Sequence, residues 1–178
     1  LPNISAGCSL ADMVTVEQVE KLKKNHPLAA VVSYVNTNAE VKAVSDICCT
    51  SANAVKIVNS LPNEEIIFLP DKNLGHYVQS KSKKHIIIWP GYCAVHQDLS
   101  GENLVEFKRE HPGAKIIAHP ECKEDVLGVA DFICGTGGMA RFAQQDLCGE
   151  FIVVTECGMT NKLREDVPGK NFYSFCNF

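Results

Sequence analysis

The sequence lacks the features that mark membrane, secreted and nucleic-acid-binding proteins. No apolar run approaches the ~20 residues that a membrane-spanning helix needs, so we expect no membrane partner. Basic residues nowhere form a dense stretch. Lys81, Lys83 and Lys84 come closest and are typical of a solvated turn, which argues against a nucleic-acid partner. No charged segment followed by an apolar one opens the chain, so nothing predicts secretion.

The cysteines also lack a familiar arrangement: there are nine, an odd number, and no two form a CxxC pair. A secreted disulfide scaffold would be shorter, richer in loops and less hydrophobic than this chain, in which 46% of the residues are hydrophobic. We therefore expect a reducing compartment, the cytoplasm or an organelle such as a plastid. Most cysteines should be buried as small apolar groups, with a few left to bind metal.

The chain does contain an internal repeat, at an offset of 85 residues. Residues 15–27 align with 100–112, 31–36 with 116–121, 44–47 with 129–132, 50–53 with 135–138 and 66–68 with 151–153. A repeat of this length indicates two copies of one structural unit. We predict two domains, residues 1–92 and residues 93–178.

Each copy predicts alternating helices and strands. A helix capped by Thr15 or Ser100 comes first, and short apolar strands follow at 30–34, 46–49 and 66–69, with counterparts at 115–118, 131–134 and 151–154. Helices are expected between these strands, and a further strand at 85–89. This order predicts an α/β fold of repeated three-layer α/β/α domains with parallel sheets. Such sheets bind ligands at the carboxyl ends of their strands.

Three cysteines occupy the same place in successive repeats. Cys8, Cys93 and Cys176 are separated by 85 and 83 residues and lie where one unit ends and the next begins. Units packed about a pseudo-threefold axis would bring these thiolates together, as an iron–sulfur cluster requires. A [4Fe–4S] cluster held by three cysteines has one open iron that can act as a Lewis acid. Single distant cysteines are more often structural, and it is their matching positions in the repeat that make metal binding an equal alternative.

The other cysteines show weaker patterns. Cys49 and Cys134 match each other in the repeat but end apolar strands, so we expect both in the core. The remaining four have no equivalent position and no predicted role: Cys48, Cys122, Cys148 and Cys157.

Longer motifs at residues 34–43, 46–56, 69–75, 89–96 and 119–122 resemble the quinolinate synthase family, and the resemblance runs from Gly7 to Cys176. It implies three similar α/β domains about a pseudo-threefold axis, two of which are present here. The first domain would lie before Leu1, which makes this chain a fragment of a longer protein. The resemblance further implies Cys8, Cys93 and Cys176 as the ligands of the [4Fe–4S] cluster.

The family condenses iminoaspartate with dihydroxyacetone phosphate and releases phosphate and two waters to give quinolinate, in NAD biosynthesis. The resemblance therefore implies these two small molecules as substrates, and a functional link to an enzyme that oxidises L-aspartate. It implies that the site is lined by Tyr34, Asn36, Ser51, His96, His119, Glu121 and Thr136, with Tyr34, His96, His119 and Glu121 catalytic.

Each of these residues also has an ordinary structural interpretation. Glu121 suits a general base and His119 its partner, but His119-Pro120-Glu121 is equally typical of a solvated turn. Tyr34 can donate a proton or simply pack at a strand end. Asn36 can orient a carbonyl or cap a helix. His96 can face the cluster or the solvent. The hydroxyls of Ser51 and Thr136 stand at expected helix N-termini, where they can cap the helix or accompany a bound anion.

Two other functions fit the same residues. The first is a non-catalytic domain that binds zinc through the three cysteines, and the second is a different dehydratase with an open iron. A brown anaerobic preparation would favour iron–sulfur over zinc, and an assay for quinolinate would separate the two enzymes.

Overall fold

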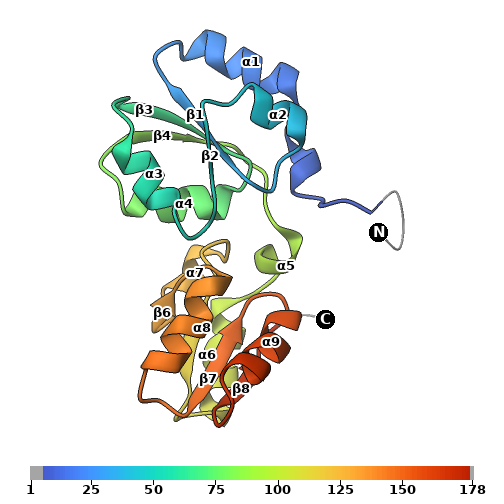
Figure 1. The fold of residues 1–178 in the computed structure, drawn as a ribbon, viewed down its shortest axis with the longest axis vertical. Helices are drawn as coiled ribbons and strands as arrows, with labels where there is room; N and C mark the ends of the chain where they lie inside the picture. Colours follow the sequence, from blue (N-terminus) through green and yellow to red (C-terminus); the bar gives the residue numbers. More distant parts are fainter. Residues whose placement is uncertain (1–5, 177–178) are drawn as a thin grey trace. The chain divides into compact units, whose positions relative to one another are not determined.

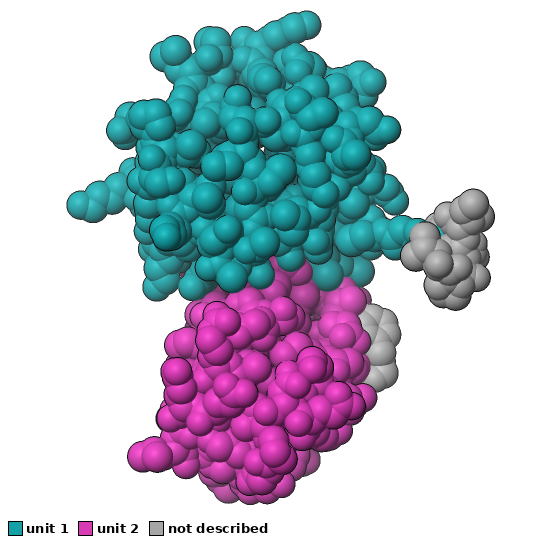
Figure 2. Space-filling model, viewed as in Figure 1, with its two compact units in different colours: residues 1–94 teal, residues 95–178 magenta. Residues whose placement is uncertain are grey.

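The computed structural model describes residues 6–176. The chain divides into two compact units, Leu1–Ala94 and Val95–Phe178 (Figures 1 and 2). Each unit is an α/β domain with its own parallel sheet of four strands. The predicted α/β fold with repeated three-layer units is therefore confirmed. None of the helices described is long and apolar enough to cross a membrane.

Unit 1 carries the sheet order β2-β1-β3-β4. The chain passes through the following elements: η1 (Ala11–Met13), α1 (Val16–Asn25), β1 (Ala30–Tyr34), α2 (Ala39–Ala43), β2 (Ile47–Cys49), α3 (Ala54–Ser60), β3 (Glu65–Leu69), α4 (Lys72–Ser80) and β4 (His85–Ile88).

Unit 2 repeats this topology with the order β6-β5-β7-β8. The short helix α5 begins one residue before this unit. The elements in chain order are α5 (Ala94–Gln97), α6 (Gly101–Glu110), β5 (Lys115–Ala118), α7 (Glu124–Leu127), β6 (Phe132–Ile133), α8 (Thr136–Gln145), β7 (Glu150–Val154), α9 (Gly158–Asp166) and β8 (Asn171–Ser174). The last strand, β8, was not predicted from the sequence, although β4 occupies the matching place in the first repeat.

Both faces of each sheet are buried, which makes three layers (Figure 1). In unit 1, Val32 of β1 packs in one cluster with residues of α3 and α4, while Val31 packs in another with residues of α1 and α2. In unit 2, Ile116 packs with α6 and α7, and Ile117 packs with α8 and α9. Because successive strand residues point to opposite faces, a continuous apolar run is what such a sheet requires.

The two units also share local hydrogen bonds at equivalent positions. Oδ2 of Asp46 accepts from the backbone N of Val31 at 2.7 Å, and Oδ2 of Asp131 accepts from the backbone N of Ile116 at 2.7 Å. The expected N-caps of α1 and α6 are confirmed: Thr15 forms a capping box, and Oγ of Ser100 accepts from the backbone N of Asn103. These bonds fix the entry into each first strand and helix.

Candidate active site

In unit 1 the predicted site residues follow the carboxyl ends of β1 and β2. Tyr34 is the last residue of β1, pairs in register with Cys49 and is 7% exposed. Asn36 lies half-buried two residues later. It does not cap α2, because the N-cap is Asn38. Capping of α2 therefore does not explain why an asparagine stands at position 36.

Ser51 stands in the turn after β2 and not at a helix N-terminus as expected. The N-cap of α3 is Asn53, whose Oδ1 accepts from the backbone N of Thr50 at 2.6 Å and from its hydroxyl at 3.1 Å. The side chain of Asn53 closes this turn better than serine, so the helix begins later than expected. In unit 2, Thr136 is the first residue of α8, as predicted, and is exposed.

Unit 2 contains a compact group of polar side chains at the carboxyl ends of β5 and β7. Nδ1 of His96 lies 2.9 Å from Oε2 of Glu121, and Nε2 of His96 lies 2.9 Å from the hydroxyl of Thr155. The ring of His96 stacks on that of His119 with centroids 4.8 Å apart. Thr155 was not singled out from the sequence, although it is the first residue after β7.

The group is buried, which excludes the interpretation of 119–121 as a solvated turn and of His96 as a surface histidine. Glu121 is 2% exposed, and His96 and His119 are each 5% exposed. His119-Pro120-Glu121 does form a turn, but not a solvated one, and His96 is no surface histidine. The backbone N of His119 donates to the carbonyl of Val154 at 3.0 Å, which extends the β5–β7 pairing into the turn and draws both side chains inward.

Burial decides the charge of His119. It lowers the pKa of the imidazole from 6.5 to about 4, with a smaller lowering by His96 and an opposing effect from Glu121. His119 is therefore neutral near pH 7. The backbone N of Glu121 donates to its Nδ1 at 3.4 Å, so the neutral ring carries its proton on Nε2. A buried carboxylate beside two imidazoles can accept, hold and return a proton.

The three cysteines predicted to bind metal differ in their state. Cys8 is an exposed free thiol and Cys93 a half-buried one, whereas Cys176 forms a disulfide with Cys157. Two of the three can thus supply thiolates as they stand, and Cys176 can do so only after reduction. No role was predicted for Cys157, whose partner lies 19 residues further along the chain.

The cysteines expected in the core are packed there to different degrees. Cys49 is buried and Cys134 half-buried, and burial raises the pKa of each thiol to about 12. Neither thiol is therefore ionised near neutral pH, whereas a cysteine that binds metal has to be a thiolate.

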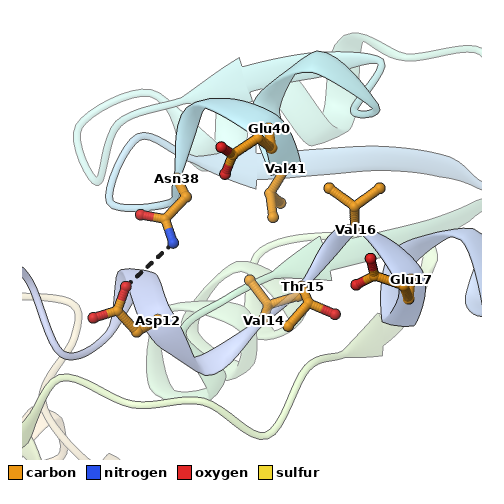
Figure 3. A pocket seen from close by; sticks show the side chains of 8 residues that line it. All are labelled: Asp12, Val14, Thr15, Val16, Glu17, Asn38, Glu40 and Val41. Atoms are coloured by element: carbon orange, nitrogen blue, oxygen red, sulfur yellow. Dashed lines mark hydrogen bonds between the residues drawn. The ribbon is translucent and has the colours of Figure 1, made fainter.

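A separate surface pocket lies in unit 1 between α1 and α2 (Figure 3). Nδ2 of Asn38 donates to Oδ1 of Asp12 at 3.2 Å across its mouth, and Glu17 and Glu40 give it an acidic lining. None of the predicted site residues lines this pocket.

Comparison with known proteins identifies relatives over the whole chain. The family described as quinolinate synthetase A protein matches residues 1–178. Quinolinate synthase 1 of Methanosarcina acetivorans is 50% identical over 178 residues, 100% of this chain and 59% of the relative. Quinolinate synthase of Geobacter metallireducens is 51% identical over 172 residues, 97% of this chain and 57% of the relative. The chain thus spans somewhat more than half the length of these relatives.

Proposed function

The chain belongs to the quinolinate synthetase A family, and on this premise we propose that it works in the condensation of iminoaspartate with dihydroxyacetone phosphate to quinolinate. Phosphate and two waters are released, and the product enters NAD biosynthesis. The observation that supports this most is the buried group of His96, His119 and Glu121, since the reaction needs several proton transfers at one protected place. Iminoaspartate would come from an enzyme that oxidises L-aspartate.

Cys8, Cys93 and reduced Cys176 would hold the [4Fe–4S] cluster. When bound, the cluster supplies a Lewis acid for the loss of water. Free thiols at Cys8 and Cys93 fit this role, and the disulfide at Cys176 makes cluster binding depend on reducing conditions. The cytoplasm or a reducing organelle is the compartment that this requirement favours.

The buried group of unit 2 is suited to move protons. The Thr155 hydroxyl would donate to Nε2 of His96, and Nδ1 of that ring, which lies 2.9 Å from Oε2 of Glu121, would carry the proton that the two groups exchange. Glu121 would act as the general base and His96 would hold the proton it shares. The neutral His119 would donate a hydrogen bond from Nε2 to a substrate oxygen.

The residues of unit 1 would contribute binding and a second acid. Tyr34, at the end of β1, can donate its phenolic proton to an enolate or ketone oxygen. Asn36, which is not the N-cap of α2, would orient a carbonyl or carboxylate. Hydroxyls at Ser51 and, in unit 2, at Thr136 would bind phosphate or carboxylate. The first turn of α8 supports this for Thr136, because exposed N–H groups there attract anions.

Glu121→Gln in the full-length protein tests the proposal. The amide keeps the shape of the side chain but cannot accept a proton, so quinolinate formation should fall by at least ~100-fold. Iron content and the brown colour should stay at the wild-type level, because Glu121 is assigned no iron ligand role. The control is Glu124→Gln, an exposed carboxylate three residues further along the chain, which should leave turnover unchanged.

The outcomes also separate the alternatives. Substantial activity in Glu121→Gln would show that Glu121 is a turn residue with no role as a base. A colourless wild-type protein that contains zinc would replace the proposal with the non-catalytic zinc domain. An iron–sulfur protein that dehydrates simple hydroxy acids and forms no quinolinate would be the other dehydratase.

A further inference from the structure

A completely buried carboxylate in unit 1 connects two segments that are distant in sequence. Asp71 follows β3, is 0% exposed and is the N-cap of α4. Its Oδ1 accepts from the backbone N of Leu74 at 2.7 Å, an ordinary capping bond. Its Oδ2 accepts from the backbone N of Cys93 at 2.9 Å, 22 residues further along the chain. The second bond has no capping role and needs its own explanation.

The backbone around Asp71 supports the same connection. The backbone N of Lys72 donates to the carbonyl of Gly91 at 2.7 Å, and Asp71 and Gly91 form an isolated parallel bridge. A side chain at Gly91 would not fit, because its Cβ would lie 2.5 Å from the carbonyl oxygen of Pro70. The segment that leads from β4 to Cys93 therefore runs directly against the segment that leads from β3 to α4.

Met13 holds the same segment from another direction. Its carbonyl accepts from Nε1 of Trp89 at 2.9 Å, and its sulfur lies 3.3 Å from the backbone N of Tyr92. With Trp89 and Tyr92 fixed in this way and the N–H of Cys93 bonded to Asp71, little rotational freedom remains in the backbone before the Cys93 side chain.

The second repeat connects the equivalent segments by different chemistry. Glu156 stands where Asp71 stands in the first repeat, but it is exposed, and its Oε1 accepts from the nearby backbone N of Gly158 at 2.7 Å. The junction cysteine of this repeat, Cys176, is joined instead to Cys157, the residue after Glu156, by a disulfide. In both repeats the junction cysteine is thus connected to the chain just after the third strand.

We propose that Asp71 is a positioning residue for Cys93, whose thiolate it fixes in the direction of the cluster through the backbone N–H. This rests on the proposed function, in which Cys93 is a cluster ligand. A ligand that is already oriented loses less freedom on binding iron and is released more slowly. A bond from an N–H to a charged acceptor is worth roughly a tenfold or larger change in an equilibrium or rate.

Asp71→Asn in the full-length protein tests the assignment. Asparagine caps helices as well as aspartate does, but its amide has one acceptor oxygen for the two N–H groups, so the Cys93 bond or the cap is lost. The matched control is Asp46→Asn, in the same unit and far along the chain from Cys93. Its amide loses the charge of the carboxylate but keeps one acceptor oxygen for the Val31 N–H. Each variant removes one negative charge, and only Asp71→Asn should disturb Cys93.

Two readouts are measured under anaerobic conditions. The first is the rate of iron release to a chelator from the loaded protein, which should rise at least ~10-fold in Asp71→Asn and stay near wild type in Asp46→Asn. The second is the alkylation rate of each cysteine in the metal-free, reduced protein, followed peptide by peptide. The ratio of Cys93 to Cys8 alkylation should change several-fold in Asp71→Asn alone.

The outcomes distinguish this proposal from the function on which it rests. Equal iron release in the two Asn variants, with an unchanged alkylation ratio, would overturn the positioning role. Cys93→Ser is expected to lose iron. If it retains a full cluster, the ligand assignment in the proposed function is wrong and the role of Asp71 in cluster retention falls with it.

Discussion

His119 and Glu121 are both buried ionisable residues in one group of side chains. Burial disfavours the charged form of an imidazole, so His119 stays neutral while Glu121 has a partner at 2.9 Å in Nδ1 of His96. The site therefore combines a neutral donor with a carboxylate acceptor inside one group. Such a division of states is what an acid–base site needs at neutral pH.

The lowered pKa of His119 predicts how the stability of the protein depends on pH. The unfolded chain binds a proton near pH 6.5, whereas the folded chain binds it only near pH 4. The free energy of unfolding should therefore fall as the pH drops from about 6.5 to about 4, with no contribution from this group above that window. Between pH ~7.5 and pH ~5 the loss is on the order of 2 kcal/mol.

Urea unfolding of the metal-free full-length protein at these two pH values checks this prediction. His119→Gln should remove most of the pH-dependent loss, and His76→Gln, which replaces an exposed histidine, should leave it in place. An unchanged loss in His119→Gln would mean that another group causes it.

The family resemblance implied most of this group, and the strand ends agreed for His119 and Glu121, but neither indicated the contacts between these side chains. His96, His119 and Glu121 were predicted from the sequence, and the structure brings them together. Thr155 and the second bond of Asp71 were missed, because each depends on a partner distant in sequence: His96 is 59 residues from Thr155, and Cys93 is 22 residues from Asp71. Sequence patterns report what stands next to a residue along the chain, and these partners meet only after the sheet has formed.

At the scale of elements, most of the predicted helices and strands came from the internal repeat. Apolar runs predicted seven of the eight strands that the structure describes, β1 and β5 with the observed bounds and the other five to within one residue at each end. The strand β8 was missed because Asn171–Ser174 contains only two aromatic residues between polar ones and has no buried run. Its pairing with β7 in register from Glu150 to Val153 is what makes it a strand.

Helix ends proved harder to place than strands. Ser51 precedes α3 by three residues. The Asn53 side chain closes the turn before the helix, and Asn53 is the N-cap without a side-chain capping bond. Thr50, Ser51 and Asn53 are all residue types that commonly cap helices. The choice among them depends on the path of the backbone out of β2.

One helix start gives a prediction at this scale. Gly101 begins α6, and a Cβ there would lie 2.5 Å from the backbone oxygen of Asp125, the second residue of α7. Gly101→Ala should lower the free energy of unfolding by about 1–3 kcal/mol, because the contact is with backbone that cannot simply rotate away. Thermal or urea unfolding of the full-length protein measures this loss.

Gly149→Ala is the matched control for that substitution. Gly149 lies in the same unit, and a Cβ there meets nothing within 4 Å. It should change the free energy of unfolding by no more than about 0.5 kcal/mol. Similar losses in the two variants would show that α6 and α7 do not meet as closely as the contact at Gly101 requires.

At the scale of the whole molecule, each unit is complete in the sense that it has its own sheet, helices and core. The residues proposed for the site come from both units: Tyr34, Asn36 and Ser51 belong to unit 1, whereas His96, His119, Glu121 and Thr136 belong to unit 2. In both units these residues lie at or after the carboxyl ends of parallel strands, or near them along the chain. Sharing of one site by the two units therefore requires that these ends face a common point.

That requirement gives the last prediction, the arrangement of the units about an axis. Equal units joined at equal junctions close around a point only if one rotation relates each to the next, and for three units this rotation is about 120°. Superposition of residues 8–92 on 93–175 should require a rotation of about 120°. The same rotation should carry Cys8 onto Cys93 and Cys93 onto Cys176. The three sulfurs should then lie roughly 6–7 Å apart, as metal–sulfur bonds of ~2.3 Å at three corners of one cluster demand.

A crystal structure of the reduced, iron-loaded full-length protein measures both quantities directly. Reduction matters, because Cys176 has to leave Cys157 before its sulfur can face the other two. Sulfurs more than about 10 Å apart in that state could not hold one cluster, and the metal chemistry would have to be abandoned. The buried proton-transfer group would survive such a result, because His96, His119, Glu121 and Thr155 are all held within unit 2.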